Sequence, residues 1–319
     1  MNSSDKCNSI RFVLKPAIIK YFGLLTGLIV IFFFHSTVVA QTQILKNDDI
    51  VVVYEPPLKN AAGEVIRIYP VLIQELKKIF GWHLDIRPQV ILVKSNRSFR
   101  QMTRNDLFVA FAVPDKNLIV IDYSRMNTRP FSLRITFKHE LCHLLLHRHI
   151  NRGNLARWLD EGVCQWVSDG IGEILLDRNW SGLDAAITAG HTLSLTGLTE
   201  TFPGDKASLM LAYEQSKSVV AYIDRHYGQD AILNLLGHLK NGAGIETATL
   251  QSLSLSVDEL EKEWLDYLER TPRWLIYLAN NLYGILFFIA AILTVCGFFL
   301  RLIRKKRWED EQEEDDWEV

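Results

Sequence analysis

The sequence carries almost no net charge, because 35 lysines and arginines offset 37 aspartates and glutamates and leave a formal charge of −2. Charge therefore gives no reason to expect a nucleic acid or another polyanion as a partner. The 319 residues also contain no internal repeat and no low-complexity linker. The hydrophobic content of 48% is at the top of the globular range, and part of this excess is concentrated in two segments, one near each end of the chain.

Cysteine is scarce as well, with four in the whole chain. Cys7 lies in the N-terminal signal region described below and Cys296 in the C-terminal apolar segment, so only Cys142 and Cys164 belong to the domain between them. An oxidising compartment would permit these two cysteines to pair. Two independent buried thiols fit the sequence equally well.

The first apolar segment, residues 21–34, has the pattern of a secretory signal. Basic residues precede it, and Val38 and Ala40 provide a small-residue cleavage site. We therefore predict a signal peptide over residues 1–40 that is cut after Ala40. An uncleaved signal anchor is the alternative, because the basic region before the apolar core is long.

The second apolar segment predicts a transmembrane helix over residues 276–300. Residues 282–300 carry no charge, and roughly 20 apolar residues span a bilayer as a helix. The basic run 301–307 follows at once and places the C-terminus in the cytoplasm. Residues 301–319 are then a cytoplasmic tail, basic and then acidic, and residues 41–273 form an extracytoplasmic domain, periplasmic if the host is bacterial. A buried core helix and a domain that faces the cytoplasm are the alternatives.

Strand patterns precede helical patterns within this domain. Four short β-rich runs are bounded by turn residues: 48–57, 87–95, 106–114 and 117–124. An amphipathic helix is expected at 66–81, and from about residue 131 the apolar period is helical. This order predicts an α+β fold with a small mixed sheet and an active-site helix, followed by a mainly helical lower lobe.

The expected helix at 132–149 contains the sequence H-E-L-C-H. His139 and His143 are four residues apart, so they share one helix face and could bring two imidazole nitrogens to one Zn²⁺ ion. Glu140 between them could act on a zinc-activated water as a general base. The motif alone is a moderate signal, and a third ligand downstream would strengthen it.

Two residues could supply that third ligand. His149 occupies the position of a third histidine in a related motif, but that motif needs a glycine where this chain has leucine. On a continuous helix His149 would lie about 15 Å along the axis from His139, out of reach. Glu161 is favoured, because the polar break at 151–154 lets a second helix return antiparallel to the first. Asp160 on that helix points about 100° away, so both carboxylates cannot face one metal.

The H-E-L-C-H motif followed by W-L-D-E-G at 158–162 resembles the gluzincin metallopeptidases, and most closely the peptidase-MA-like group. The resemblance covers roughly residues 107–268. It implies Zn²⁺ as the cofactor, held by His139, His143 and Glu161, with Glu140 as general base.

The resemblance also bears on the surroundings of the site. It implies that 117–124 is the sheet edge beside the cleft, where a peptide could add as an extra strand. Some gluzincins carry an acidic partner four residues after the ligand glutamate, but this chain has Gln165 there, so the hydrogen bond that orients a ligand histidine must come from elsewhere. Tyr213 is a candidate oxyanion donor, because a phenol can donate a hydrogen bond. A core tyrosine is the alternative for this residue.

Together these patterns predict a membrane-anchored zinc metalloendopeptidase whose substrates are peptides or proteins near the membrane surface. The alternative is a catalytically inactive scaffold, zinc-binding or metal-free, that binds peptide or envelope partners. The intact Glu140 argues against a scaffold, because a structural zinc site does not require a general base.

Overall fold

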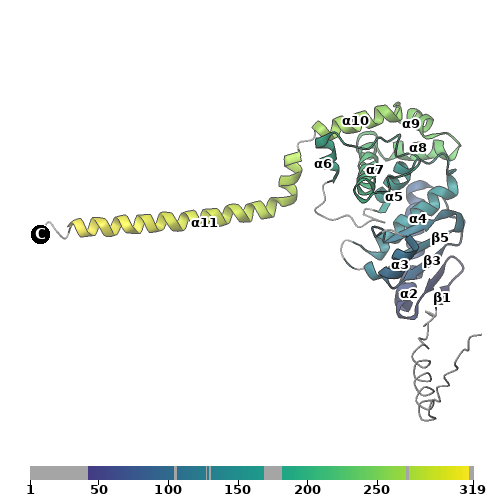
Figure 1. Ribbon diagram of the computed structural model, residues 1–319, viewed down its shortest axis with the longest axis horizontal. Helices are drawn as coiled ribbons and strands as arrows, with labels where there is room; N and C mark the ends of the chain where they lie inside the picture. Colours follow the sequence, from purple (N-terminus) through teal and green to yellow (C-terminus); the bar gives the residue numbers. More distant parts are fainter. Residues whose placement is uncertain are drawn as a thin grey trace, which may run out of the picture.

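The computed structural model describes residues 42–103, 106–126, 128, 131–168, 182–270 and 273–315. The predicted signal peptide over 1–40 lies outside these residues. The described chain forms one mixed sheet, with α-helices after its second and third strands, and then a series of helices (Figure 1), in agreement with the α+β prediction.

The sheet has five strands in the spatial order β1-β2-β3-β5-β4. Their bounds are β1 Gln43–Lys46, β2 Val51–Tyr54, β3 Gln89–Val93, β4 Ala110–Val113 and β5 Leu118–Asp122. The three central strands β2, β3 and β5 run parallel, whereas β1 and β4 pair antiparallel at the two edges. Parallel strands buried on both faces explain why these runs consist almost entirely of valine, isoleucine and leucine.

One expectation about the sheet is wrong. The run 117–124 contains β5, which pairs with β3 on one side and β4 on the other, so the edge strand is β4. The tight turn Pro114–Lys116, which ends in left-handed Asn117, folds β4 and β5 into a hairpin, and the pairing of β5 with β3 leaves β4 at the edge. Sequence marks both strands but does not show which of them pairs with β3.

Ten α-helices are described: α2 Lys59–Phe80, α3 Asn96–Thr103, α4 Leu133–His149, α5 Arg157–Ser168, α6 Gly182–Ala189, α7 Lys206–Tyr227, α8 Gln229–Lys240, α9 Ile245–Leu253, α10 Val257–Arg270 and α11 Arg273–Asp315. Three short 3₁₀ turns accompany them at Pro56–Leu58, Pro114–Lys116 and Tyr123–Arg125. Helix α2 begins before the predicted 66–81, because Ala61, Ala62 and Val65 are also buried in the core.

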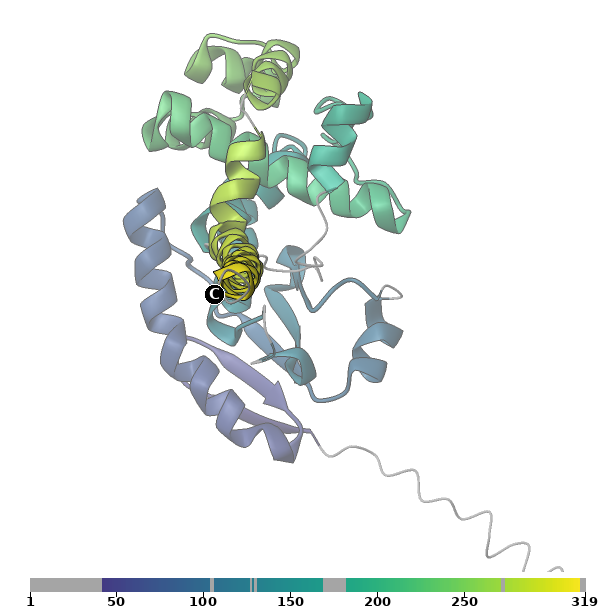
Figure 2. The same cartoon turned by 90° about the vertical axis from the view of Figure 1, so that its left-hand side faces the viewer.

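Alternate residues of the strands face different helices. Val90 and Ile119 belong to the main core with α2 and α4, whereas Val93 and Val120 pack with Phe99 of α3. This period of two is the ordinary alternation of a β-strand. In Figure 2 the sheet, together with α2 and α3, forms the lower part of the domain, and α7–α10 form the upper part. Helices α4 and α5 lie where these two parts meet.

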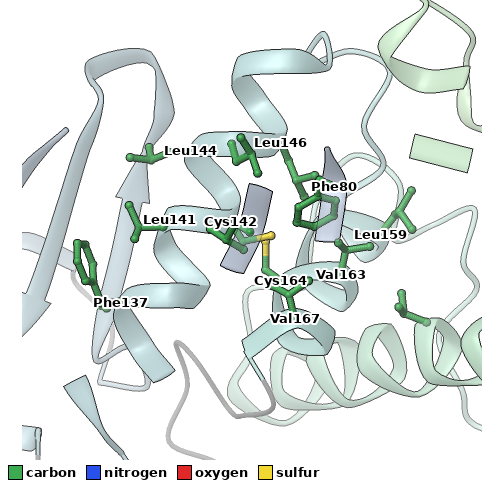
Figure 3. Close-up of a cluster of buried hydrophobic side chains, with 14 of the residues drawn as sticks. Phe80, Phe137, Leu141, Cys142, Leu144, Leu146, Leu159, Val163, Cys164 and Val167 are labelled. Carbon is green, nitrogen blue, oxygen red and sulfur yellow. The ribbon is translucent and has the colours of Figure 1, made fainter. Parts of the chain in front are cut away.

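Helix α4 begins at Ser132, whose side chain accepts a hydrogen bond from the backbone nitrogen of Ile135. Figure 3 shows Phe137 and Leu141 on the side of α4 that faces the strands, while Cys142 points toward Cys164 on α5. Both cysteines are buried and free. The thiol side chains therefore lie side by side in the contact between the two helices.

Helix α11 contains a 23-residue stretch, Asn281–Ile303, with a mean hydropathy of 2.5 and no buried share. This stretch is long and apolar enough to cross a membrane, and Figure 1 shows α11 running away from the rest of the protein. A transmembrane helix over 276–300 and the domain limits at 41–273 and 301–319 remain predictions.

Candidate metal centre

His139 and His143 of α4 lie on the face that meets Glu161 of α5. The two Nε2 atoms are 3.1 Å apart, and Oε2 of Glu161 is 3.5 Å from each of them. All three residues are buried, with exposed fractions of 0%, 4% and 0%. The structure thus brings together the three residues that the sequence predicts as metal ligands.

These spacings fit a tetrahedral zinc ion. Zinc binds histidine nitrogen and carboxylate oxygen at about 2.0–2.2 Å, which places two ligand atoms of a tetrahedral site roughly 3.3–3.5 Å apart. Oε2 of Glu161 is also buried without a hydrogen-bond partner among the described residues. Because a buried carboxylate oxygen needs compensation, a cation at this position is chemically suitable.

The other oxygen of Glu161 is held by neighbouring side chains. Oε1 accepts from Nη2 of Arg157 at 2.6 Å and from the Tyr213 hydroxyl at 3.2 Å. Burial acts to raise the pKa of Glu161, but the positive charge of Arg157 and the contact with His143 outweigh burial and lower it. The carboxylate is therefore charged, and Oε2 is left to face the histidines.

Asp160 contacts the same histidine from the opposite side. Its Oδ1 lies 2.8 Å from Nδ1 of His143, and its Oδ2 lies 2.9 Å from Nε2 of His147. Burial acts to lower the pKa of His143, but the charges of Asp160 and Glu161 outweigh burial and raise it well above its ordinary value. Consecutive carboxylates on α5 thus meet different nitrogens of one imidazole, in keeping with the 100° between successive helix positions.

The contact between Asp160 and His143 is a feature of the site that was not predicted from the sequence. Gln165, at the position where some gluzincins have an acidic partner, donates instead to the backbone carbonyl of Tyr213 at 3.1 Å. A usable signal was present, because Asp160 precedes Glu161 directly and a polar residue there must find a partner once α5 is buried. His147 is also more enclosed than a surface histidine, with a side chain 16% exposed.

The remaining candidates fall into two groups. Glu140 is fully buried next to His139 on α4, and Tyr213 lies within hydrogen-bond distance of Glu161. His149 is outside the centre, because its Nε2 contacts the backbone oxygen of His83 at 2.7 Å. The structure therefore places Glu140 and Tyr213 close to the predicted ligands and separates His149 from them.

A cavity of about 460 Å³ opens beside His143 and Tyr213. The residues that line it include the polar His143, His147 and Asp160 and the aromatic Phe202 and Tyr213. Ala112 of the edge strand β4 also reaches it. The centre is thus next to a space with both polar and apolar walls, which is typical of a ligand pocket.

Residues 103–270, more than half of the chain, match the Peptidase MA superfamily. A search of curated protein sequences finds no match.

Solved structures that this chain resembles include yeast LTA4 hydrolase in complex with bestatin, at 14% identity and a TM-score of 0.44 over 73% of this chain and 38% of that one. Another is a variant of an M1 zinc metallopeptidase from Deinococcus radiodurans bound to a Tyr-Ser-Ala substrate, at 15% identity and a TM-score of 0.37 over 70% of this chain and 51% of that one. The chain therefore spans well under two thirds of the length of these proteins.

Proposed function

This chain belongs to the Peptidase MA superfamily, and on that basis we propose that it is a membrane-anchored, zinc-dependent metalloendopeptidase. The observation that carries the proposal is the convergence of two histidine Nε2 atoms and one oxygen of Glu161 on a single buried point. His139, His143 and Glu161 would hold the zinc ion. Three protein ligands leave a fourth position open, as catalytic zinc sites do.

A zinc ion held there would supply Lewis acidity, which lowers the pKa of a water molecule and polarises a substrate carbonyl. Glu140 would take the proton from the attacking water and pass it to the leaving amine. Tyr213 would donate a hydrogen bond to the oxygen that gains negative charge in the transition state. In this assignment Arg157 holds Oε1 of Glu161, so that the carboxylate keeps Oε2 toward the metal.

The proposed substrate is a peptide or protein segment in an extended conformation. The cavity reaches the edge strand β4, which pairs with β5 alone among the described strands, so its outward backbone groups could pair with an added peptide strand. The helix Asn281–Ile303 would anchor the enzyme and restrict it to substrates near the membrane. In the proposed topology residues 41–273 are extracytoplasmic, periplasmic if the host is bacterial, and the C-terminus is cytoplasmic.

The test uses the full chain purified in detergent, with zinc measured by elemental analysis. We expect one zinc per chain in the wild type, loss of zinc in Glu161→Gln, and retention in His149→Ala, the matched histidine outside the centre. A wild-type chain that folds and binds no zinc would support the scaffold alternative instead. Loss in His149→Ala with retention in Glu161→Gln would overturn the ligand assignment.

Activity is tested separately on a pool of quenched fluorescent peptides. We expect cleavage by the zinc-loaded wild type and none by Glu140→Gln, although this variant should still bind zinc. Equal cleavage by both proteins would show that the activity belongs to a contaminating protease or that another residue is the base.

A further inference from the structure

The carboxylate of Asp160 is buried between the two helices of the metal centre, with its side chain 2% exposed. Each of its oxygens contacts a different histidine of α4: Oδ1 meets Nδ1 of His143 at 2.8 Å, and Oδ2 meets Nε2 of His147 at 2.9 Å. Nη1 of Arg157 lies farther away, 3.7 Å from Oδ2. Asp160 therefore links two histidines that are one helical turn apart.

The contact with Asp160 decides which nitrogen of His143 carries hydrogen. An ionised carboxylate only accepts hydrogen bonds, so Nδ1 of His143 must donate to it. An imidazole that binds a metal is neutral and has one N–H, so with Nδ1 donating to Asp160 the lone pair of His143 lies on Nε2. This is the nitrogen that faces His139 and Glu161, so Asp160 selects the tautomer that a metal at this point requires.

His139 has no comparable carboxylate partner at Nδ1 among the described residues. Its Nδ1 is buried without a hydrogen-bond partner among the residues that the structure describes. Among the described residues, the Cys164 thiol also lies near Nδ1 of His143, at 3.4 Å, and a thiol is a weak hydrogen-bonding group. Within the described chain, a carboxylate thus orients one of the two proposed ligand histidines and not the other.

His147 fixes the second oxygen of Asp160. Without this contact, rotation of the carboxylate would cost only one strong hydrogen bond, that to His143. With both oxygens engaged by residues of the same helix, rotation breaks two hydrogen bonds to a charged group. His147 also lines the cavity, so it lies between Asp160 and the space open to solvent or substrate.

We propose that Asp160 and His147 are positioning residues for His143, and that His147 acts through Asp160. This inference rests on the proposed function, because its consequence is the zinc affinity of His143. A second metal bound by His143, His147 and Asp160 is a different reading of the same cluster. It would need Nδ1 of His143 as a ligand while Nε2 serves the first metal, and a neutral imidazole has only one lone pair.

The experiment measures the zinc dissociation constant of the full chain in detergent by competition with a fluorescent chelator. The variants are His147→Ala, His147→Gln, Asp160→Ala and the double variant His147→Ala/Asp160→Ala. Loss of a partner that orients a metal-binding histidine typically weakens metal affinity about 10–100-fold. We expect Asp160→Ala to fall in that range and His147→Ala to cause a smaller loss.

Two comparisons separate positioning from a merely structural effect. The glutamine amide can donate to Oδ2, so His147→Gln should restore most of the affinity lost in His147→Ala. If His147 acts through Asp160, removing His147 should have no further effect in the Asp160→Ala background. If Asp160→Ala does not fold, the alanine and glutamine variants at His147 still decide the question, because that residue is partly exposed.

Visible absorption of the Co²⁺-substituted chain gives a second readout, since its band positions report ligand geometry. We expect shifted bands in His147→Ala and wild-type bands in His147→Gln. Unchanged zinc affinity and unchanged bands in His147→Ala, or additive losses in the double variant, would overturn the inference while leaving the proposed function intact. Two zinc ions per wild-type chain would also overturn it. A wild type that binds no zinc would remove the proposed function and this inference together.

Discussion

Asp160 and Glu161 are consecutive residues, yet their carboxylates meet opposite nitrogens of His143. Oδ1 of Asp160 lies 2.8 Å from Nδ1, and Oε2 of Glu161 lies 3.5 Å from Nε2. Both carboxylates can reach the ring from different sides because successive side chains of a helix diverge by about 100°. One helical turn thus supplies both a proposed ligand and the group that orients another ligand.

Gly162 follows these two residues at the contact between α5 and α7. A Cβ atom at this position would lie closer than 3.0 Å to the backbone oxygen of Ser216 and to Cγ2 of Val220. We expect Gly162→Ala to push α5 away from α7, to lower the free energy of unfolding by about 1–3 kcal/mol and to weaken zinc binding.

Gly237 in α8 provides the matched control for this prediction, because a Cβ atom there meets nothing within 4 Å. Gly237→Ala should be neutral or stabilise the protein by up to about 1 kcal/mol. Thermal unfolding and zinc titration of both variants check the pair. Equal behaviour of the two alanine variants would contradict the close approach of α5 and α7.

Tyr213 is predicted to act in catalysis more than in metal binding. The Tyr213→Phe variant removes the hydroxyl that contacts Oε1 of Glu161, but Arg157 still holds that oxygen at 2.6 Å. We therefore expect zinc to stay bound while kcat falls about 100-fold or more, as when an oxyanion donor is lost.

Steady-state kinetics and zinc analysis on one preparation check this prediction. Loss of zinc in Tyr213→Phe would make this residue a support of Glu161. An unchanged kcat would make Tyr213 an ordinary core tyrosine.

Removal of zinc should destabilise the protein. The three proposed ligands converge only in the folded chain, so zinc binds the native state and stabilises it by mass action. At free zinc about 100–1,000 times the dissociation constant, the gain is about 3–4 kcal/mol. We expect a chelator to lower the unfolding temperature of the wild type and to leave that of Glu161→Gln unchanged. The same shift in both proteins would place the stabilising metal elsewhere.

We expect Glu75 of α2 to make a pH-dependent contribution to the stability of the folded protein. It pairs with Arg134 and, at 3.1 Å, with Lys138, the residue before His139 on α4. Burial acts to raise the pKa of Glu75, but Lys138 and Arg134 outweigh burial and lower it. A lowered pKa in the folded state means that the stabilisation is complete above the unfolded-state pKa and is lost as pH falls through the folded-state pKa.

We expect Glu75→Gln to lower the free energy of unfolding by about 0.5 kcal/mol at pH 7, a small value because solvent screens the pair. The difference from the wild type should shrink toward zero as the pH falls through the lowered folded-state pKa of Glu75. Unfolding curves at several pH values check both points, and a difference that grows toward acid would refute the assigned sign.

Several local features of this protein followed from the sequence. The spacing of His139 and His143 predicts a shared helix face, and α4 spans both residues. Ser256 and Glu259 have capping-box spacing, and each side chain accepts from the other's backbone nitrogen at the start of α10. These features depend on residues three or four apart, so helix geometry alone decides them.

Features that depend on distant pairings did not follow in the same way. Sequence marked 106–114 and 117–124 as strands, but the pairing of β5 with β3 decides that β4 is the edge. The edge position matters for the proposed peptide binding, since only an edge strand can accept an added strand.

The sequence by itself therefore determined the apolar stretch Asn281–Ile303, the helix that carries His139, Glu140 and His143, and the existence of a second helix with Glu161. Only the tertiary structure decided how the second helix faces the first. The close packing of α5 on α4 and α7 turns Oε2 of Glu161 toward the histidines and buries Asp160 against His143. Side-chain partners of this kind depend on the rotation of one helix against another, which no local pattern specifies.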